Sequence, residues 1–285
     1  MTRLTPEMIR NVPRASAERD ADLVKVLGTT LKGLAYEAVG ISPRDLVMEE
    51  LTAAAVPVTS GKGATEGFTE SVSAIAEHLG MTSFVTERTD VAGLSDALSA
   101  GVDMIFMADD EEFVAMNCHA RKVATNTCST ALGYFTALRL AAGGLQGKEV
   151  LLIGAGRVGS CAAELLWREK ALVTVVDADI TKAEALRNRF KELRVSDDLK
   201  AMVETSSLIL NASPARIPGP WIREGAVVSS PGMPFSYDDE GMSKMGGLIH
   251  DPLQIGVSVM AVWSASFSLS KKALPNGGLV GMEAI

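Results

Sequence analysis

A glycine-rich turn between an apolar run and a helical pattern constrains the fold more than any other feature. Glu149 to Ile153 predicts a buried strand, Gly154-Ala155-Gly156-Arg157-Val158-Gly159 follows at once, and Ser160 to Lys170 has helical spacing. In this order the motif is the fingerprint of a Rossmann domain that binds a dinucleotide. Further apolar runs, separated by helical segments, predict a doubly wound parallel sheet. They are Leu172–Val176, Ser207–Leu210, Ala226–Val228 and Leu248–Ile249.

Each glycine of the turn has an expected part in holding the cofactor. Gly154 would make the tight turn, Gly156 would let the backbone approach the pyrophosphate, and Gly159 would let the helix pack closely on the strand. The start of the helix offers unpaired N–H groups and a partial positive charge to phosphates. Arg157 and Val158 open that helix and belong to the same predicted site.

An acidic residue at the end of the next strand favours NAD over NADP. Asp177 follows the run Leu172 to Val176, at about the expected distance after the glycine turn. Its carboxylate can accept hydrogen bonds from both hydroxyls of the adenosine ribose. A 2′-phosphate would instead meet Asp177 and Asp179, with no adjacent arginine. We therefore predict NAD as the cofactor.

Two later strand ends extend this predicted site. Asn211-Ala212-Ser213-Pro214 and Ser229-Ser230-Pro231-Gly232 follow apolar runs, where ligands of open α/β sheets bind. Their small residues would let the nicotinamide half lie close to the backbone. The predicted cofactor contacts here are Ala212, Ser213, Pro214 and Pro231.

The first half of the chain alternates helical patterns with short apolar runs, which indicates a smaller α/β layer. Expected helices cover Glu18–Leu34, Phe68–Leu79 and Leu94–Ala100, and expected strands cover Val56–Val58, Phe84–Val85 and Met104–Met107. A long helix from Thr125 to Ala142 would join the two halves, and Ala261 to Leu269 would close the fold. We predict a substrate-binding and catalytic domain over 1–125. The NAD-binding Rossmann domain would cover 126–285, with the connecting and C-terminal helices.

Composition narrows the partners. A net charge of −8 makes nucleic acid and anionic membrane surfaces poor partners. No signal peptide is visible, and the serine-broken apolar stretch Ile255 to Leu269 is shorter than a bilayer span, so we expect a cytoplasmic protein. The three cysteines predict free thiols, and Cys118-His119 with Cys128 lacks a fourth metal ligand, so no metal is predicted. A homodimer is compatible with these properties.

Two polar patches mark the expected substrate side. The segment Val58 to Gly63 puts the hydroxyls of Thr59 and Ser60 directly after a predicted strand. Asp109 and Asp110 directly follow the strand Met104 to Met107, so they should point into a cleft, where a carboxylate can hold an ammonium group. We expect Glu111 and Glu112 to be a solvated face.

These residues lie in motifs that resemble one family along nearly the whole chain. The resemblance covers Leu4-Thr5-Pro6-Glu7, Val56 to Gly61 with Phe68, Glu70 and Ser71, Ala74-Ile75-Ala76, Asp90-Val91, Met107 to Asp110 with Phe113, Cys128, the glycine turn, Asp177-Ala178-Asp179, Pro231-Gly232, and Pro252-Leu253 with Gly256. With these motifs the chain resembles the pyrrolysine synthases, dehydrogenases that complete pyrrolysine biosynthesis.

The resemblance implies an NAD-dependent oxidation of the terminal amine of 3-methyl-D-ornithyl-lysine, a dipeptide-like small molecule. The imine would lose ammonia to give an aldehyde, and the α-amine of the same moiety would close the pyrroline ring with loss of water. The resemblance places Ser60 and Asp110 at the reaction centre, holding polar ends of the substrate, with Asp109 and Thr59 beside them. Leu4 and the helix that it begins would cover the substrate.

Two other functions fit the coarse pattern. Another two-domain NAD enzyme, an amino-acid or shikimate-like dehydrogenase, would share the architecture but would not account for the first-half motifs. A non-catalytic NAD sensor would need no acid-lined cleft. The proton acceptor is also open: His250 beside Asp251 is one candidate, and Lys62 is another by analogy with the lysine base of amino-acid dehydrogenases. His78 is expected to pack rather than react.

Overall fold

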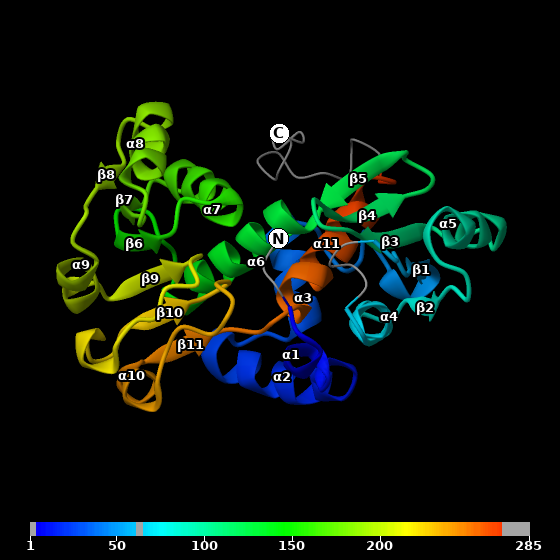
Figure 1. Ribbon diagram of the computed structural model, residues 1–285, viewed down its shortest axis with the longest axis horizontal. Helices are drawn as coiled ribbons and strands as arrows, with labels where there is room; N and C mark the ends of the chain where they lie inside the picture. Colours follow the sequence, from blue (N-terminus) through cyan, green and yellow to red (C-terminus); the bar gives the residue numbers. More distant parts are fainter. Residues whose placement is uncertain (1–3, 61–64, 270–285) are drawn as a thin grey trace.

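A computed structural model describes residues 4–60 and 65–269, in which two sheets lie on either side of a long helix, α6 (Asn126–Ala141) (Figure 1). Lys62 and the tail beyond Ser270 lie outside the described residues. No helix within the described ranges combines the length and the apolarity that a membrane crossing needs.

The first sheet is mixed, with the strand order β2-β1-β3-β4-β5. Strands β1 (Thr52–Val56), β2 (Thr82–Val85) and β3 (Met104–Ala108) are parallel, as an α/β layer predicts. The hairpin of β4 (Phe113–Asn117) and β5 (Lys122–Thr125) adds two antiparallel strands that were not predicted.

The strand predicted over Val56–Val58 is misplaced, since β1 runs from Thr52 to Val56. Pro57 has no backbone N–H to donate to a neighbouring strand, so β1 ends before it. The preceding residues, Ala53 to Ala55, are fully buried, but alanines carry little strand signal in a sequence.

Helices cover both faces of this sheet. Ala53 and Ala55 face the cluster that includes Val72 of α4 (Phe68–His78), whereas Ala54 packs with Ala97 of α5 (Asp90–Ser99) on the other face. This alternation follows from the two-residue period of a strand.

The single helix predicted over Glu18–Leu34 is wrong. The chain forms α2 (Val12–Leu27) and α3 (Leu31–Val39), preceded by the short α1 (Pro6–Ile9). Gly28 ends α2 with a φ of +72°, a left-handed conformation that glycine adopts without strain. Thr30 then caps α3 by accepting a hydrogen bond from the Gly33 N–H.

The second sheet is parallel throughout its six strands, in the order β11-β10-β9-β6-β7-β8, which confirms the predicted Rossmann-like architecture. Its strands are β6 (Glu149–Ile153), β7 (Leu172–Val176), β8 (Arg194–Val195), β9 (Leu208–Asn211), β10 (Val227–Ser229) and β11 (Gly247–Ile249). The helices around it are α7 (Arg157–Arg168), α8 (Ile180–Arg189), α9 (Leu199–Thr205) and α10 (Asp239–Lys244), with a 3-10 turn at Gly219–Trp221. Another 3-10 turn, Met48–Glu50, precedes β1 of the first sheet.

Helix α6 packs along α11 (Gln254–Ser266), which is buried over its whole length. Two glycines permit the close approach: a Cβ on Gly133 would lie 2.5 Å from Ile255, and one on Gly256 would lie 2.6 Å from Thr130 Oγ1. Helix α11 begins earlier than the predicted Ala261, because the buried Asp251 carboxylate accepts the backbone N–H groups of its start. The division into domains at 125/126 stays a prediction.

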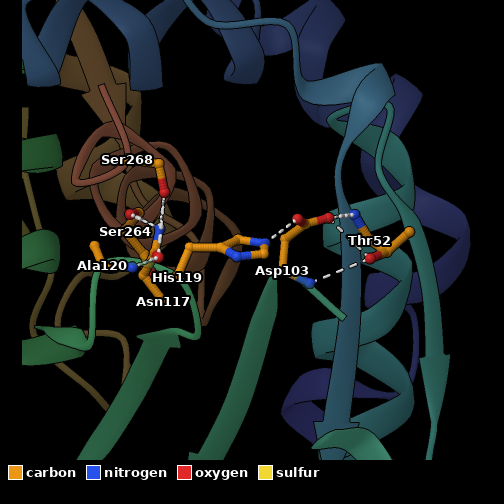
Figure 2. A network of polar contacts seen from close by, with 7 residues as sticks. All are labelled: Thr52, Asp103, Asn117, His119, Ala120, Ser264 and Ser268. Atoms are coloured by element: carbon orange, nitrogen blue, oxygen red, sulfur yellow. Dashed lines mark hydrogen bonds and ion pairs between the residues drawn. The ribbon is translucent and has the colours of Figure 1, made fainter. Parts of the chain in front are cut away.

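A polar network fastens the end of the first sheet that lies away from the acidic residues after β3 (Figure 2). Asp103 accepts hydrogen bonds from the N–H and Oγ1 of Thr52 and contacts His119 at 2.8 Å. Asn117 Nδ2 donates to Ser264 O at 2.8 Å and so ties the hairpin to the end of α11. Within the described residues, no group of three or more histidine, cysteine or acidic side chains is placed to hold a metal ion.

Candidate functional site

The three glycines of the turn after β6 occupy three different environments. Gly154 has a φ of +95°, and a Cβ there would lie 3.0 Å from Ala212 O. A Cβ on Gly159 would lie 1.9 Å from Gly154 O, so α7 can pack on this turn only with glycine at that position. Gly156 is exposed, and a Cβ there would enter open space. The first and third glycines therefore serve packing, and the second faces the side on which a ligand can approach.

The start of α7 suits a dinucleotide phosphate. Gly156 is its N-cap and provides no side chain to satisfy the first N–H groups of this 12-residue helix. These N–H groups and the helix dipole favour an anion. The open space at Gly156 gives such a group access, so the residues present fit a dinucleotide.

Asp177 lies at the end of β7 and supports the glycine turn directly. Its Oδ2 accepts the Ala155 N–H at 2.6 Å, and its Oδ1 accepts the Asp179 N–H at 2.8 Å. A carboxylate has about four lone-pair sites, so these bonds leave room for ribose hydroxyls. Asp179 instead caps α8 through Thr181, and hydrogen bonds from Thr181 lower the pKa of its carboxyl.

The loops after β9 and β10 meet the glycine turn. The buried Asn211 accepts hydrogen bonds from Ser213 N and Oγ through its Oδ1, and its backbone oxygen accepts the Gly232 N–H at 3.0 Å. A Cβ on Gly232 would lie 2.1 Å from Ser213 O. Ala212 and Ser213 thus lie beside Gly154. Pro231 is half-buried and Pro214 is exposed.

The acidic loop, defined as residues 109–112 between β3 and β4, is organised by its own first carboxylate. Asp109 Oδ1 accepts the N–H groups of Glu111 and Glu112 at 2.8 and 2.9 Å, and the Asp109 N–H donates to Glu112 O. Hydrogen bonds from the backbone of Glu112 and Glu111 hold the pKa of Asp109 below its usual range. Asp109 therefore shapes the loop, and Asp110 is exposed on it.

The other predicted substrate residues lie on neighbouring elements. Thr59, after β1, donates from its N and Oγ1 to Asp90 at 2.9 and 2.6 Å, which fixes the backbone just before the exposed Ser60. Leu4 is half-buried against the core just before α1, and α1 packs on α4. The candidate base Lys62 lies outside the described residues.

Arg157 connects the predicted cofactor side to the acidic loop. The sequence analysis did not predict this contact. Arg157, the first residue of α7, donates through Nη1 to Glu111 O at 2.6 Å and forms an ion pair through Nη2 with Glu112. Glu112, predicted to be a solvated residue, is half-buried because it meets this partner from the other sheet. No local pattern carried that signal, since 45 residues separate the pair.

Two cysteines on α6 and α7 face each other. Cys128 on α6 and Cys161 on α7 have their Sγ atoms 2.9 Å apart. The hydrogen bond from Cys161 is the main cause that lowers the pKa of Cys128 to about 7. The same contact, and then burial, raise the pKa of Cys161.

The histidines have structural partners. His250 Nδ1 lies 2.7 Å from Ser230 O, its ring packs against Phe235, and burial lowers its pKa. It lines a pocket with Arg19, Asp22 and Lys25 of α2. His78 contacts Asp20 at 2.9 Å and links α4 to α2, as its expected packing role requires.

Two family models match different parts of the chain. Residues 8–124 match the family model described as the N-terminal domain of the pyrrolysine biosynthesis protein PylD, and residues 137–230 match the model for shikimate / quinate 5-dehydrogenase. The pyrrolysine synthase of Methanosarcina acetivorans is 34% identical over 265 residues, which are 91% of this chain and 98% of that protein. That of Methanosarcina barkeri is 33% identical over 266 residues, 91% of this chain and 97% of that protein.

A solved structure of quinate dehydrogenase from Corynebacterium glutamicum, in complex with NAD, shares the fold. It aligns with a TM-score of 0.52 at 12% identity and covers 76% of this chain and 93% of that one.

The lowered pKa of Cys128 predicts alkylation at neutral pH. A thiol with a pKa of about 7 is about half thiolate at pH 7, so the alkylation rate with iodoacetamide should rise between roughly pH 6 and 8 and then level off. Peptide mass spectrometry measures this rate. In Cys161→Ala the midpoint should move to a higher pH, because this variant lacks the hydrogen bond that lowers the pKa of Cys128. A wild-type midpoint near the ordinary thiol value of about 8.5 would contradict the prediction.

Proposed function

The chain belongs to the pyrrolysine synthase family, and we propose that it completes pyrrolysine biosynthesis by oxidising the terminal amine of 3-methyl-D-ornithyl-lysine with NAD. Family membership makes it an enzyme of the last biosynthetic step and a dehydrogenase. The observation that carries the detailed proposal is the contact of Arg157 with Glu111 and Glu112, which puts the acidic loop beside the glycine turn. A carboxylate for an amine and a turn for a dinucleotide are thereby neighbours.

The proposed cofactor is a pyridine nucleotide, and specifically NAD. The glycine turn and the start of α7 would hold its pyrophosphate, Asp177 its adenosine ribose, and the loops after β9 and β10 its nicotinamide half. When bound, NAD supplies the hydride acceptor. Asp177 and the adjacent Asp179 put negative charge where NADP carries its 2′-phosphate, although Lys182 offsets part of it 3.9 Å from Asp179. This charge supports NAD over NADP.

The substrate would be held on the first-sheet side. Asp110 is exposed on the acidic loop and is the proposed group that binds the ammonium end, by a charge-assisted hydrogen bond. Ser60 would hold another polar end of the substrate, next to Thr59, which is held by Asp90. Leu4 would cover the substrate and exclude water. The homodimer and the cytoplasmic location stay predictions.

Positioning is the main chemical demand of the proposed reaction. Hydride transfer requires the amine-bearing carbon to lie roughly 3–3.5 Å from its acceptor. The amine must lose its proton first, so a partly desolvated cleft assists by disfavouring the charged form. Hydrolysis of the imine by water releases ammonia and leaves an aldehyde. The α-amine then closes the ring with loss of water, an intramolecular step for which effective molarities on the order of 10⁵ M or more are reached in well-oriented cases.

An assay with the synthetic dipeptide tests the proposal. Pure protein, NAD and 3-methyl-D-ornithyl-lysine should produce NADH absorbance and a product that has lost ammonia and two hydrogens by mass spectrometry. The alternative, an amino-acid or shikimate-like dehydrogenase, predicts turnover of a free amino acid or a hydroxy acid and none of the dipeptide. Binding of NAD without any turnover would instead favour a sensor.

Asp110→Asn should weaken substrate binding without affecting the cofactor. Loss of one charge-assisted hydrogen bond, worth about 1.5–3 kcal/mol, should raise KM for the dipeptide about 10- to 100-fold. NADH binding, followed by fluorescence, should stay unchanged. Glu111→Gln removes the same charge one residue away and serves as the control. Equal losses of NADH binding and of dipeptide turnover would point to a folding role for Asp110.

Asp177→Ala should relax the preference for NAD over NADP. The carboxylate both accepts from the ribose hydroxyls and repels a 2′-phosphate, so its removal should lower the ratio of kcat/KM values for the two cofactors at least about tenfold. Asp198→Ala removes a carboxylate that caps helix α9, which precedes β9 of the same sheet. This control variant should leave the ratio of kcat/KM values unchanged. Unchanged selectivity in Asp177→Ala would remove the ribose contact from the proposal.

A further inference from the structure

We propose that Arg157 and Glu112 are a pair of positioning residues that hold the acidic loop at the glycine turn and thereby set the place of Asp110 relative to the cofactor. The inference rests on the proposed function and adds a role that neither residue has in it. Arg157 contacts both Glu111 O and the Glu112 carboxylate. It lies on α7, the helix that follows β6 of the second sheet, whereas the acidic loop joins two strands of the first sheet.

The geometry of the arginine favours a directional contact rather than a loose ion pair. A guanidinium is planar, and its two neighbouring donors here engage a carbonyl and a carboxylate together. The second carboxylate oxygen of Glu112, Oε2, is buried and has no hydrogen-bond partner within the described part of the chain. Within the described residues, the polar contact of the Glu112 carboxylate is thus the one with Arg157, and its other oxygen is buried without a hydrogen bond.

The anchor on the other side is rigid. Arg157 is the first residue of α7, and the position of α7 is set by the packing of Gly159 on Gly154 O. A guanidinium has five N–H donors, and two of them are used by the acidic loop. The remaining donors leave the same side chain able to face a phosphate at the start of α7, as its predicted cofactor contact requires.

The contact is transmitted to Asp110 through the loop itself. Asp109 accepts the N–H groups of both Glu111 and Glu112, and its own N–H donates to Glu112 O, so the four residues form one closed turn. A hold on residues 111 and 112 therefore also holds residue 110. A misplacement of about 1 Å at such a site can cost about 100-fold in rate.

Glu112→Gln tests the pair, with Glu111→Gln as its matched control. Glu112→Gln removes the ion pair, so kcat for the dipeptide should fall about tenfold while KM and the Kd for NADH change less than about twofold. Glu111→Gln removes an equal charge from an exposed neighbour but keeps the carbonyl that Arg157 contacts, so kcat should stay within about twofold of wild type. Equal effects of the two variants on kcat, or a loss confined to KM, would overturn the proposal.

A second measurement does not depend on turnover. Amide hydrogen exchange of residues 109–112 in the cofactor-free protein should quicken about tenfold in Glu112→Gln and remain at the wild-type rate in Glu111→Gln. Unchanged exchange in Glu112→Gln would refute the hold on the loop. If the wild type does not turn over the dipeptide, the proposed function fails, and the exchange rates still decide whether the pair fixes the loop.

Discussion

The close packing of α7 on the end of β6 is the constraint on which the predicted cofactor half depends. Gly159 lies so near Gly154 O that a single methyl group would separate helix from strand. This close packing positions the start of α7, where Gly156 borders open space and Arg157 is the first helical residue. Asp177 strengthens the same turn through the Ala155 N–H. The proposed phosphate site and the proposed hold on the acidic loop thus share one packing contact.

The two sheets are joined by helices that pack closely against each other. Helix α6 packs on α11 through Gly133 and Gly256, and Tyr134 of α6 exchanges hydrogen bonds with the backbone of Asp251 just before α11. Side chains from α2 and α3 complete this contact around Tyr134. A buried connection of this kind resists bending, because close-packed interiors transmit strain rather than absorb it. In contrast to this buried connection, the side chains of Arg157 and Glu112 are both partly exposed to solvent.

Charge is distributed unevenly across the candidate site. The side proposed for the substrate carries carboxylates, and one of them, Asp109, is stabilised as an anion by backbone N–H groups. The turn proposed for the cofactor offers N–H groups and Arg157, which favour anions. The proposed cationic amine and anionic dinucleotide would therefore be attracted to adjacent but different surfaces, and this complementarity supports the proposal of a two-part site.

Local patterns in the sequence determined the parallel sheet, the glycine turn and Asp177 at the next strand end, because strand periodicity and the steric demands on glycine act over a few neighbouring residues. They also placed Asp109 and Asp110 just after β3. Only the tertiary structure decided that Asp109 closes its own loop and that Glu112 meets Arg157. It likewise decided that Cys128 faces Cys161, and that β4 and β5 extend the first sheet. These features depend on which distant segments meet, and that is set by packing of the whole chain rather than by any local pattern.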